Sequence, residues 1–441
     1  MKWQRMILRI ALCLSIVTSF YLSYLIWLNP TKTVATTPIA SETNTQGEMT
    51  TKNFRSLTDV FLPLQLVSVT DSQANETNSE QLIKSVLSEI GSSEMEQPKW
   101  TSYESADAFI EKTTIKNGFD FIFMNRISLN EAIDLFDLKL DLDAQLLDKE
   151  LMFDQMSYNS ETKTIHFVDA AKKSDLSANV TVDESEIATI LKQEKVNWQR
   201  VTFTPELLLQ HYLVDQPVQM KLYSYISTVQ PYSVFRDSFF HTPQEATLSD
   251  DTNDLMLTDQ SEVMTVQLDN RLVEYRDTDI TGIHDNLYVK SYDYIRNLGM
   301  NYGNLRFLDR YENTLNYRIF VEGFPVFSNQ NDGLVSMQFT EKAQNQDEWS
   351  VKIAASLNTI QIPIPSDKLI ELPSNKSVLL DLQAQGLDLS RVSAIMVGYE
   401  WSDIKDTNVV DLVPTWYIKY DHTWQSQDAL SQQLQQSAGE H

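Results

Sequence analysis

Hydrophobic and polar positions along this chain form one long uncharged run near the start, followed by shorter stretches with helix or strand periodicity. The 19 residues of 10–28 carry no charged side chain. As a helix they would span roughly 28 Å, close to the ~30 Å hydrocarbon core of a bilayer. Lys2, Arg5 and Arg9 precede the run, and basic residues favour the cytoplasmic side. We therefore expect a cytoplasmic N-terminus at 1–9, a single-pass transmembrane helix at 10–28 and an extracellular bulk.

A cleaved signal peptide is the competing interpretation, because it shares the basic start and the apolar middle. Here the apolar run ends in the bulky segment 24–28, which has no small-x-small cleavage site, and 33–35 (Thr-Val-Ala) is a weak candidate. A lipoprotein would need a small residue immediately before Cys13, where Leu12 stands. We therefore favour an anchor that is retained in the cell membrane.

Residues 29–52 are polar, poor in aromatic residues and without periodicity, which is typical of a flexible stalk. The next segment, 53–200, combines both kinds of periodicity. Apolar residues recur on one face of a helix at 79–90, as expected for an amphipathic helix. Two strand-like stretches, 151–158 and 164–168, flank a polar turn and predict a hairpin. We expect an extracytoplasmic α+β domain over 53–200.

The rest of the chain divides by the same criteria. Residues 201–283 mix short strands with turns and predict a small β-rich middle domain. In 284–424 one helix precedes several strand-like stretches, which indicates an α+β module: the helix is expected at 285–298 and the strands at 305–311, 315–321, 333–340, 349–355, 392–399 and 413–420. Residues 425–441 are expected to be a frayed polar tail. The predicted fold class is α+β, with one transmembrane helix followed by several domains of antiparallel sheets with packed helices.

The charge balance narrows the classes of function. The 61 Asp and Glu outnumber the 35 Lys and Arg, which gives a formal net charge of −26. An acidic surface disfavours a nucleic-acid partner and is repelled by anionic lipid headgroups, although solubility alone explains the charge equally well. The single cysteine, Cys13, lies in the apolar run. The exported part therefore has no disulfide, and its stability has to come from packing.

The sequence contains no His-Glu-x-x-His, no Gly-x-Ser-x-Gly, no phosphate loop and no dinucleotide glycine fingerprint. A Ser-x-x-Lys match at 160–163 falls in the predicted hairpin turn. Acidic clusters at 134–143 and 250–254 lack the residue order and the glycine of a calcium loop. No two histidines have ligand spacing; they are His166, His211, His241, His284, His422 and His441. We therefore expect no catalytic residue, no cofactor and no metal.

Four short segments carry a family resemblance: 60–66 (VFLPLQL), 321–327 (VEGFPVF), 397–400 (VGYE) and 412–420 (LVPTWYIKY). Together with the basic N-terminus and the single membrane helix, they resemble the YycH family of membrane-anchored regulatory proteins in low-GC Gram-positive bacteria. The Gly-x-Pro-Val-Phe and Val-Pro-x-Trp-Tyr motifs, expected on adjacent strands, also resemble the PepSY-type domains of the companion YycI family. The resemblance therefore implies a YycI/PepSY-like fold for 284–424.

The residues that define these motifs make sense as structure. Glycine and proline shape the starts and edges of strands, and the aromatic residues alternate between core and surface. We interpret them as structural rather than as a direct partner contact; they are Gly323, Pro325, Phe327, Gly398, Tyr399, Pro414 and Trp416.

The resemblance implies a non-enzymatic regulator of an essential two-component system that controls cell-wall metabolism. It would bind the sensor histidine kinase WalK, also called YycG, and act together with YycI. Ser15, Ser19 and Ser23 are spaced four apart and put small polar residues on one face of the predicted membrane helix, which suits close helix packing. Two alternatives stay open: an extracytoplasmic hydrolase acting on the cell wall, and a ligand-sensing binding module.

Overall fold

The computed structural model describes residues 55–192, 196–204, 212–249, 254–281, 286–299, 302–342 and 345–439. All of them belong to one compact unit, 50–441. Three predictions lie outside the described residues: the stalk, the transmembrane helix and its serine stripe of Ser15, Ser19 and Ser23. Among the residues that are described, no helix combines the length and the apolar character that a membrane span requires.

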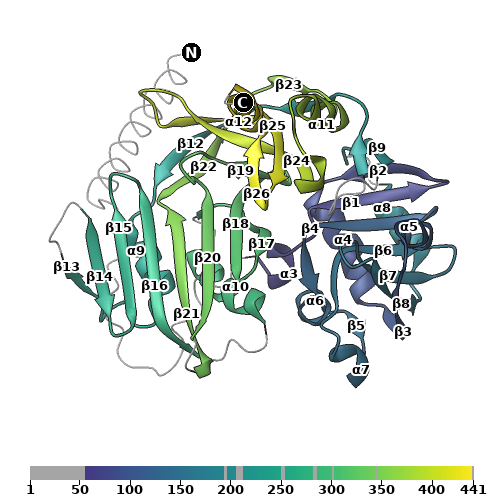
Figure 1. The fold of residues 1–441 in the computed structure, drawn as a ribbon. Helices are drawn as coiled ribbons and strands as arrows, with labels where there is room; N and C mark the ends of the chain where they lie inside the picture. Colours follow the sequence, from purple (N-terminus) through teal and green to yellow (C-terminus); the bar gives the residue numbers. More distant parts are fainter. Residues whose placement is uncertain are drawn as a thin grey trace, which may run out of the picture. The chain divides into compact units, whose positions relative to one another are not determined.

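The first part of the chain forms a ten-stranded sheet (Figure 1), in which the neighbouring strands are antiparallel except for the last pair. The strands follow one another in the order β10 (Tyr212–Val214), β9 (Gln199–Phe203), β2 (Gln73–Thr77), β1 (Gln65–Thr70), β4 (Gly118–Ser128), β6 (Met152–Asn159), β7 (Thr164–Asp169), β8 (Ser174–Val180), β3 (Glu94–Ser102) and β5 (Lys139–Leu140).

Helices accompany this sheet: α3 (Leu57–Val60), α4 (Glu80–Gly91), α5 (Ala106–Thr113), α6 (Leu129–Phe136), α7 (Ala144–Leu147) and α8 (Glu184–Leu191). The helix predicted at 79–90 is confirmed as α4. Its apolar residues recur every three or four positions, and this face is buried and packs on α6 and α8, because an amphipathic helix gains stability by burying its apolar stripe.

The predicted hairpin is confirmed as the antiparallel pair β6 and β7. In its turn, the Asn159 side chain accepts hydrogen bonds from the backbone N–H groups of Glu161 and Thr162, at 3.0 and 3.3 Å. Lys163 adopts the left-handed conformation with φ 55°, which is typical of a tight turn. Ser160 and Lys163 therefore lie in a turn and not one helical turn apart.

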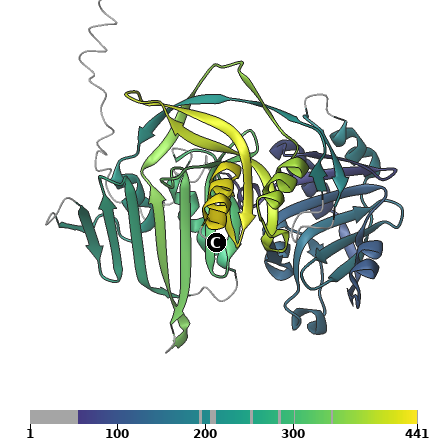
Figure 2. The ribbon, with the colours of Figure 1, turned by 45° about the horizontal axis from the view of Figure 1, so that its top comes forward.

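The second part of the chain forms a 14-stranded sheet (Figures 1 and 2). Its main path runs β13 (Thr247–Ser249), β14 (Leu255–Asp259), β15 (Glu262–Gln267), β16 (Leu272–Thr281), β21 (Asn345–Ser356), β20 (Leu334–Lys342), β18 (Thr314–Val321), β19 (Phe324–Phe327), β24 (Val392–Asp403), β25 (Val409–Tyr420), β12 (Tyr223–Val229) and β22 (Asn358–Ile364). Two further strands pair off this path, β17 (Leu305–Tyr311) with β18 and β26 (Thr423–Ser426) with β25.

A separate two-stranded sheet consists of β11 (Val218–Lys221) and β23 (Leu369–Leu372). The helices of the second part are α9 (Tyr232–Phe239), α10 (Leu287–Leu298), α11 (Asn375–Ala384), the short 3₁₀ helix η2 (Leu389–Arg391) and α12 (Gln427–Gly439). α9 and α10 pack against each other, and α9 also contacts β16. The helix predicted at 285–298 is thus confirmed as α10, and the predicted α+β class is confirmed as well.

A buried ion pair joins β25 and β17 and reaches the first sheet. The Lys419 ammonium lies 2.8 Å from the Asp309 carboxylate, and each side chain is only 4% exposed. Lys419 also donates to the backbone carbonyl of Met124 in β4, at 3.2 Å. Burial alone would raise the pKa of the Asp309 carboxyl, but the Lys419 charge and the hydrogen bonds from Lys419, Asn316 and Trp424 together outweigh it and lower the pKa. The pair therefore stays ionised inside the protein.

Two expectations for the last part of the chain are wrong. β19 and β25 are not adjacent, because β24 lies between them and pairs with β19 in parallel. Within the predicted tail 425–441, the described residues 425–439 are not frayed: α12 packs on β25 and β26, and its Leu430 is fully buried. One apolar residue in a polar helix is enough to anchor it when it faces the core.

The predicted domain limits stay predictions. Strand pairing shows that 201–283 supplies strands to all three sheets: β9 and β10 to the first, β11 to the two-stranded sheet, and β12 to β16 to the large one. The strands on either side of position 283 share the large sheet through the pairing of β16 with β21.

Candidate functional site

A cavity of about 620 Å³ lies where β1, β2 and the start of α4 meet β11, β19, β24 and β25. Cavities of 300–1,000 Å³ are typical of small-molecule sites. All four motif segments contribute to its wall, through Gln65, Glu322, Gly323, Phe324, Val397, Tyr399 and Trp416. Residues from all the segments that carry the family resemblance therefore lie around one cavity.

Gly323 shapes one wall of this cavity because no larger residue fits there. Its φ is +84°, and a Cβ at this position would lie 2.2 Å from the backbone oxygen of Asn78. Asn78 in turn donates from its side-chain amide to the carbonyl of Leu64, at 2.8 Å. Only glycine tolerates both this backbone conformation and this approach. The turn between β18 and β19 is thereby held against the connection from β2 to α4.

Aromatic side chains also line the cavity. The ring of Tyr399 lies edge-on to Tyr223 and Phe324, with centroids 5.7 and 6.3 Å away. The Tyr399 hydroxyl donates to the Lys221 carbonyl at 3.2 Å, and the Trp416 indole donates to the Pro373 carbonyl at 2.9 Å. Because these polar ends are bonded to the backbone, the rings are fixed and their faces and edges are available to the cavity.

Glu76 is the chemically unusual residue of the lining. It lies on β2 opposite Val67, is 7% exposed, and its Oε2 has no hydrogen-bond partner among the described residues. The Oε1 of Gln65, on neighbouring β1, is buried and unpartnered in the same part of the chain. Burial raises the pKa of the Glu76 carboxyl to about 8, since the charged form loses its hydration. At neutral pH this carboxyl is mostly protonated in the empty cavity.

Glu80, at the start of α4, differs from Glu76 because it is paired with cations and its pKa is lowered. Arg55 and Arg306 lie 2.6 and 3.1 Å from its two oxygens. Burial on its own would raise the pKa of Glu80, but the two guanidinium charges lower it. The Arg306 side chain is fully buried and also donates to the carbonyls of Leu62 and Pro63, at 3.0 and 3.3 Å. Glu80 is therefore a structural anion that orients the motif segment 60–66.

The remaining motif residues lie in the strands beside the cavity. The rings of Phe327 and Tyr417 stack with centroids 3.8 Å apart, and a Cβ on Gly398 would lie 2.7 to 2.8 Å from both rings. Gly398 is therefore required for this stacking. Pro414 pairs with β24 on one side, while β12 pairs with β25 only up to Leu412, so the missing N–H of the proline is not needed for a second ladder.

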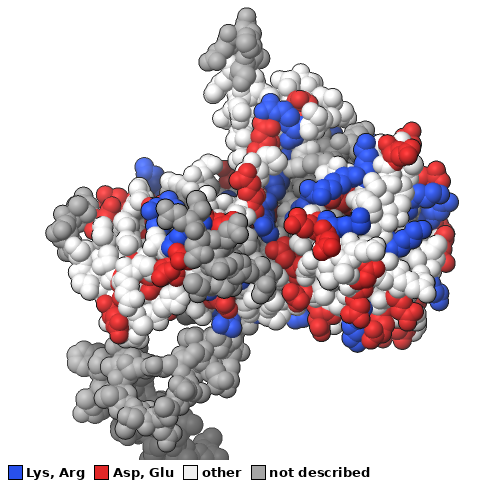
Figure 3. Space-filling model, turned by 60° about the horizontal axis from the view of Figure 1, so that its bottom comes forward, with Lys and Arg blue, Asp and Glu red and all other residues white. Residues whose placement is uncertain are grey.

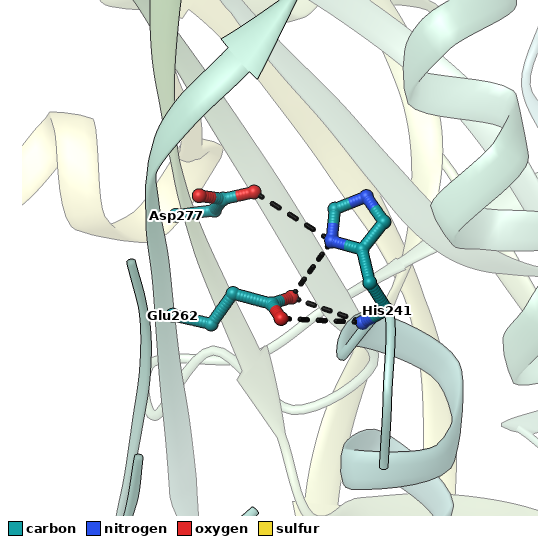
Figure 4. A group of neighbouring side chains, drawn as sticks. All are labelled: His241, Glu262 and Asp277. Carbon is teal, nitrogen blue, oxygen red and sulfur yellow. Dashed lines mark hydrogen bonds and ion pairs between the residues drawn. The ribbon is translucent and has the colours of Figure 1, made fainter. Parts of the chain in front are cut away.

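A second cluster joins His241, Glu262 and Asp277 (Figure 4). The Nδ1 atom of His241 lies 3.0 Å from Glu262 and 3.8 Å from Asp277. One imidazole and two carboxylates are a donor set that divalent transition metals accept. However, Glu262 already accepts from the Tyr275 hydroxyl at 2.5 Å and from the His241 backbone N–H at 3.0 Å. The Ser261 hydroxyl donates to Asp277 at 2.9 Å. The cluster is thus complete as a hydrogen-bonded link between the end of α9 and β15 and β16.

Sequence patterns identified part of the cavity. Gly323, Tyr399 and Trp416 line it, whereas Phe327 and Gly398 support it from the adjoining strands. Glu76 was not singled out, because segments distant in the sequence form much of the cavity wall around it. The group of His241, Glu262 and Asp277 was not singled out, because three separate segments bring its members together. For Glu76, the one local signal is a carboxyl on the same strand face as buried Ala74. His211, His284 and His441 lie outside the described residues.

The molecular surface is mixed in charge where it can be seen. On the face drawn in Figure 3, acidic and basic side chains are interspersed, with acidic ones gathered along one edge. Continuous basic surface is what a nucleic-acid site requires, and this face does not present it.

Comparison with known proteins agrees with the family resemblance. The profile of the family described as "YycH protein, C-terminal domain" matches residues 209–433, just over half of the chain. The fold is similar to a crystal structure of YycH from Bacillus subtilis, with a TM-score of 0.66 and 18% sequence identity over 85% of this chain and 98% of that chain. A search of curated protein sequences found no match. From the extent of the profile match, the chain belongs to the YycH family.

Proposed function

We propose that this chain is a non-enzymatic, membrane-anchored regulator that binds the sensor histidine kinase WalK (YycG) and acts with YycI to control cell-wall metabolism. The observation that carries the proposal is the family match over residues 209–433. Membership of the YycH family implies regulation of the YycG/WalK pathway, and the family is a regulatory one. Direct binding of the kinase, cooperation with YycI and the membrane anchor are the parts that the proposal adds.

The mechanism we propose is differential binding. A protein shifts a kinase between signalling states only by contacting one state more favourably than the other. The helix at 10–28 would pack against the membrane helices of the kinase through Ser15, Ser19 and Ser23. The extracytoplasmic part would contact the kinase or YycI outside the membrane.

In-membrane crosslinking from the helix at 10–28 tests this proposal. We expect a photoreactive residue beside the serine stripe to capture the kinase, and replacement of all three serines by leucine to reduce the yield at least severalfold. Val17→Leu with Tyr21→Leu is the matched control, because at 100° per residue these positions face away from the stripe. Equal capture from both faces removes the stripe from the mechanism. Absence of the kinase among the captured proteins defeats the proposal.

A ligand-sensing role is a second candidate, and the cavity favours it because it combines a volume suited to a small molecule with an unpartnered buried carboxyl. The hydrolase alternative predicts turnover of purified peptidoglycan by the full chain. Glu80, one of the carboxyls near the cavity, is bound by two arginines, which suits a structural role better than acid–base catalysis.

A further inference from the structure

The side chains that line the cavity include buried hydrogen-bonding groups without a partner in the part of the chain that the structure describes. Oε2 of Glu76 and Oε1 of Gln65 are both buried and unpartnered among the described residues, and both residues line the cavity. Native proteins bond the great majority of their buried polar atoms. The two atoms belong to side chains on neighbouring strands that line the same cavity. This points to a partner that comes from outside the chain.

The charges around the cavity favour a cation as that partner. Four charged residues line it, namely Glu76, Glu80, Lys221 and Glu322. Glu80 is neutralised by Arg55 and Arg306, as described above. The Lys221 ammonium lies 5.4 Å from the centroid of the Tyr223 ring and makes no ion pair with a described carboxylate, and Glu322 is exposed on its turn. Among the described residues, Glu76 is thus a buried carboxyl without a paired cation, and a buried carboxylate is stable only when paired.

The rest of the lining matches a peptide-like molecule. It is rich in side-chain amides, among them Gln65, Asn78, Asn197, Gln199, Gln219 and Asn375. An amide offers both a donor and an acceptor, which is the complement of a peptide bond. Within the protein, Asn78 and Gln219 already donate and Asn375 already accepts one hydrogen bond. The aromatic wall of Tyr223, Phe324 and Tyr399 adds apolar area and ring faces that attract a cation.

We propose that this cavity binds a short peptide-like ligand with a primary ammonium group, which forms an ion pair with Glu76. On binding, the Glu76 carboxyl releases its proton to solvent and the resulting carboxylate accepts hydrogen bonds from the ammonium. The ligand amides bond to Gln65 and the neighbouring side-chain amides. This inference is independent of kinase regulation, since it concerns only the residues that surround the cavity.

Proton release sets a pH dependence for the binding. Because burial raises the pKa of Glu76 to about 8 in the empty protein, an ammonium ligand has to displace a proton below that pH. Affinity therefore rises about tenfold per pH unit between pH 6 and 7 and levels off above pH 8. The ε-amine of a lysine side chain keeps its charge throughout this range. The other titratable side chains that line the cavity are Glu80, Glu322, Lys221, Tyr223 and Tyr399.

The test is calorimetric titration of the full chain, purified in detergent, with two probes that differ in one charge. Nα-acetyl-L-lysine amide carries a primary ammonium and two amides, and its Nε-acetylated form has an extra amide in place of the ammonium. We expect the charged probe to bind, with about one proton released near pH 6.5, and the neutral probe to bind at least tenfold more weakly. Glu76→Gln should lose that preference and the pH dependence.

Equal affinity for the two probes, or no heat from either at millimolar concentration, overturns the proposal. Unchanged binding of the charged probe by Glu76→Gln also overturns it. The comparison of probes uses the natural chain, so the result stands even where the variant fails to fold. Because no kinase is present in the titration, failure here leaves the regulatory proposal intact, and failure of crosslinking leaves this one intact.

Discussion

Replacement of Glu76 by Gln should make the empty protein more stable, by an amount that depends on pH. The carboxyl is 7% exposed, and burial raises its pKa from 4.5 to about 8. Between these two values the folded chain holds a proton that the unfolded chain has lost. Stability contributed by the protonated carboxyl is therefore complete below pH 4.5 and is lost as the pH rises towards 8. Glutamine is neutral at every pH, so the Glu76→Gln variant does not lose this stability as the pH rises.

The size of the effect follows from the pKa difference. One pKa unit corresponds to about 1.4 kcal/mol, so a carboxyl with these values weakens folding by about 3 to 5 kcal/mol at pH 8 and hardly at all at pH 4. We expect Glu76→Gln to match the natural chain at pH 4 and to exceed its free energy of unfolding by that amount at pH 8. The measurement is urea unfolding of the full chain in detergent, followed by tryptophan fluorescence, at pH 4, 6 and 8.

Two controls identify the cause. Glu94→Gln changes an exposed carboxyl on β3 and should leave the pH dependence unchanged. Asp154→Asn changes a second buried carboxyl, on β6, whose pKa burial also raises to about 8. It should therefore remove a similar part of the pH dependence of the free energy of unfolding. A gain from Glu76→Gln that is the same at pH 4 and pH 8 would show that the carboxyl is not protonated in the folded state, and the reasoning would be refuted.

Three further substitutions probe the packing of the fold. Lys419→Met leaves the buried Asp309 carboxylate without its cation and should lower the free energy of unfolding by about 3 to 5 kcal/mol; a loss below 1 kcal/mol in urea unfolding contradicts the assignment. Gly323→Ala should lower the melting temperature more than Gly299→Ala, because both have positive φ but only the first meets a backbone carbonyl; equal shifts argue against the close packing. Leu430→Ala should cost about 2 to 5 kcal/mol, whereas a frayed tail would show no change.

Hydrophobic periodicity was sufficient to predict the elements whose stabilising contacts are close together in the sequence. α4 has an apolar face that can be read from spacing alone, and β6 and β7 are joined by a turn whose Asn159 caps it from within. Strand pairing over long distances has no such signal. The insertion of β24 between β19 and β25 brings together segments some seventy residues apart, and a register of this kind depends on side chains from the whole sheet.

The site was predictable only where glycine and aromatic residues are conspicuous in the motif segments. Gly323 and Gly398 stand out in a sequence with 11 glycines, and both prove to be positions where a Cβ has no room. Glu76 carries no such mark, because a glutamate in a polar strand is ordinarily solvated. Its burial comes from the cavity walls, which are contributed by residues more than a hundred positions away.

The structural interpretation of the motif residues and a binding role for the cavity support each other. Gly323 and the Tyr399 ring are structural in the sense that packing fixes them, yet what they fix is the shape of a hollow that contains an unpartnered carboxyl. If the chain regulates a kinase and also binds an ammonium ligand, thermodynamic linkage makes the two affinities reciprocal. A ligand that weakens kinase binding tenfold must itself bind tenfold more weakly to the kinase complex. Equal ligand affinity for the free chain and for the complex would mean that the cavity, although occupied, has no part in signalling.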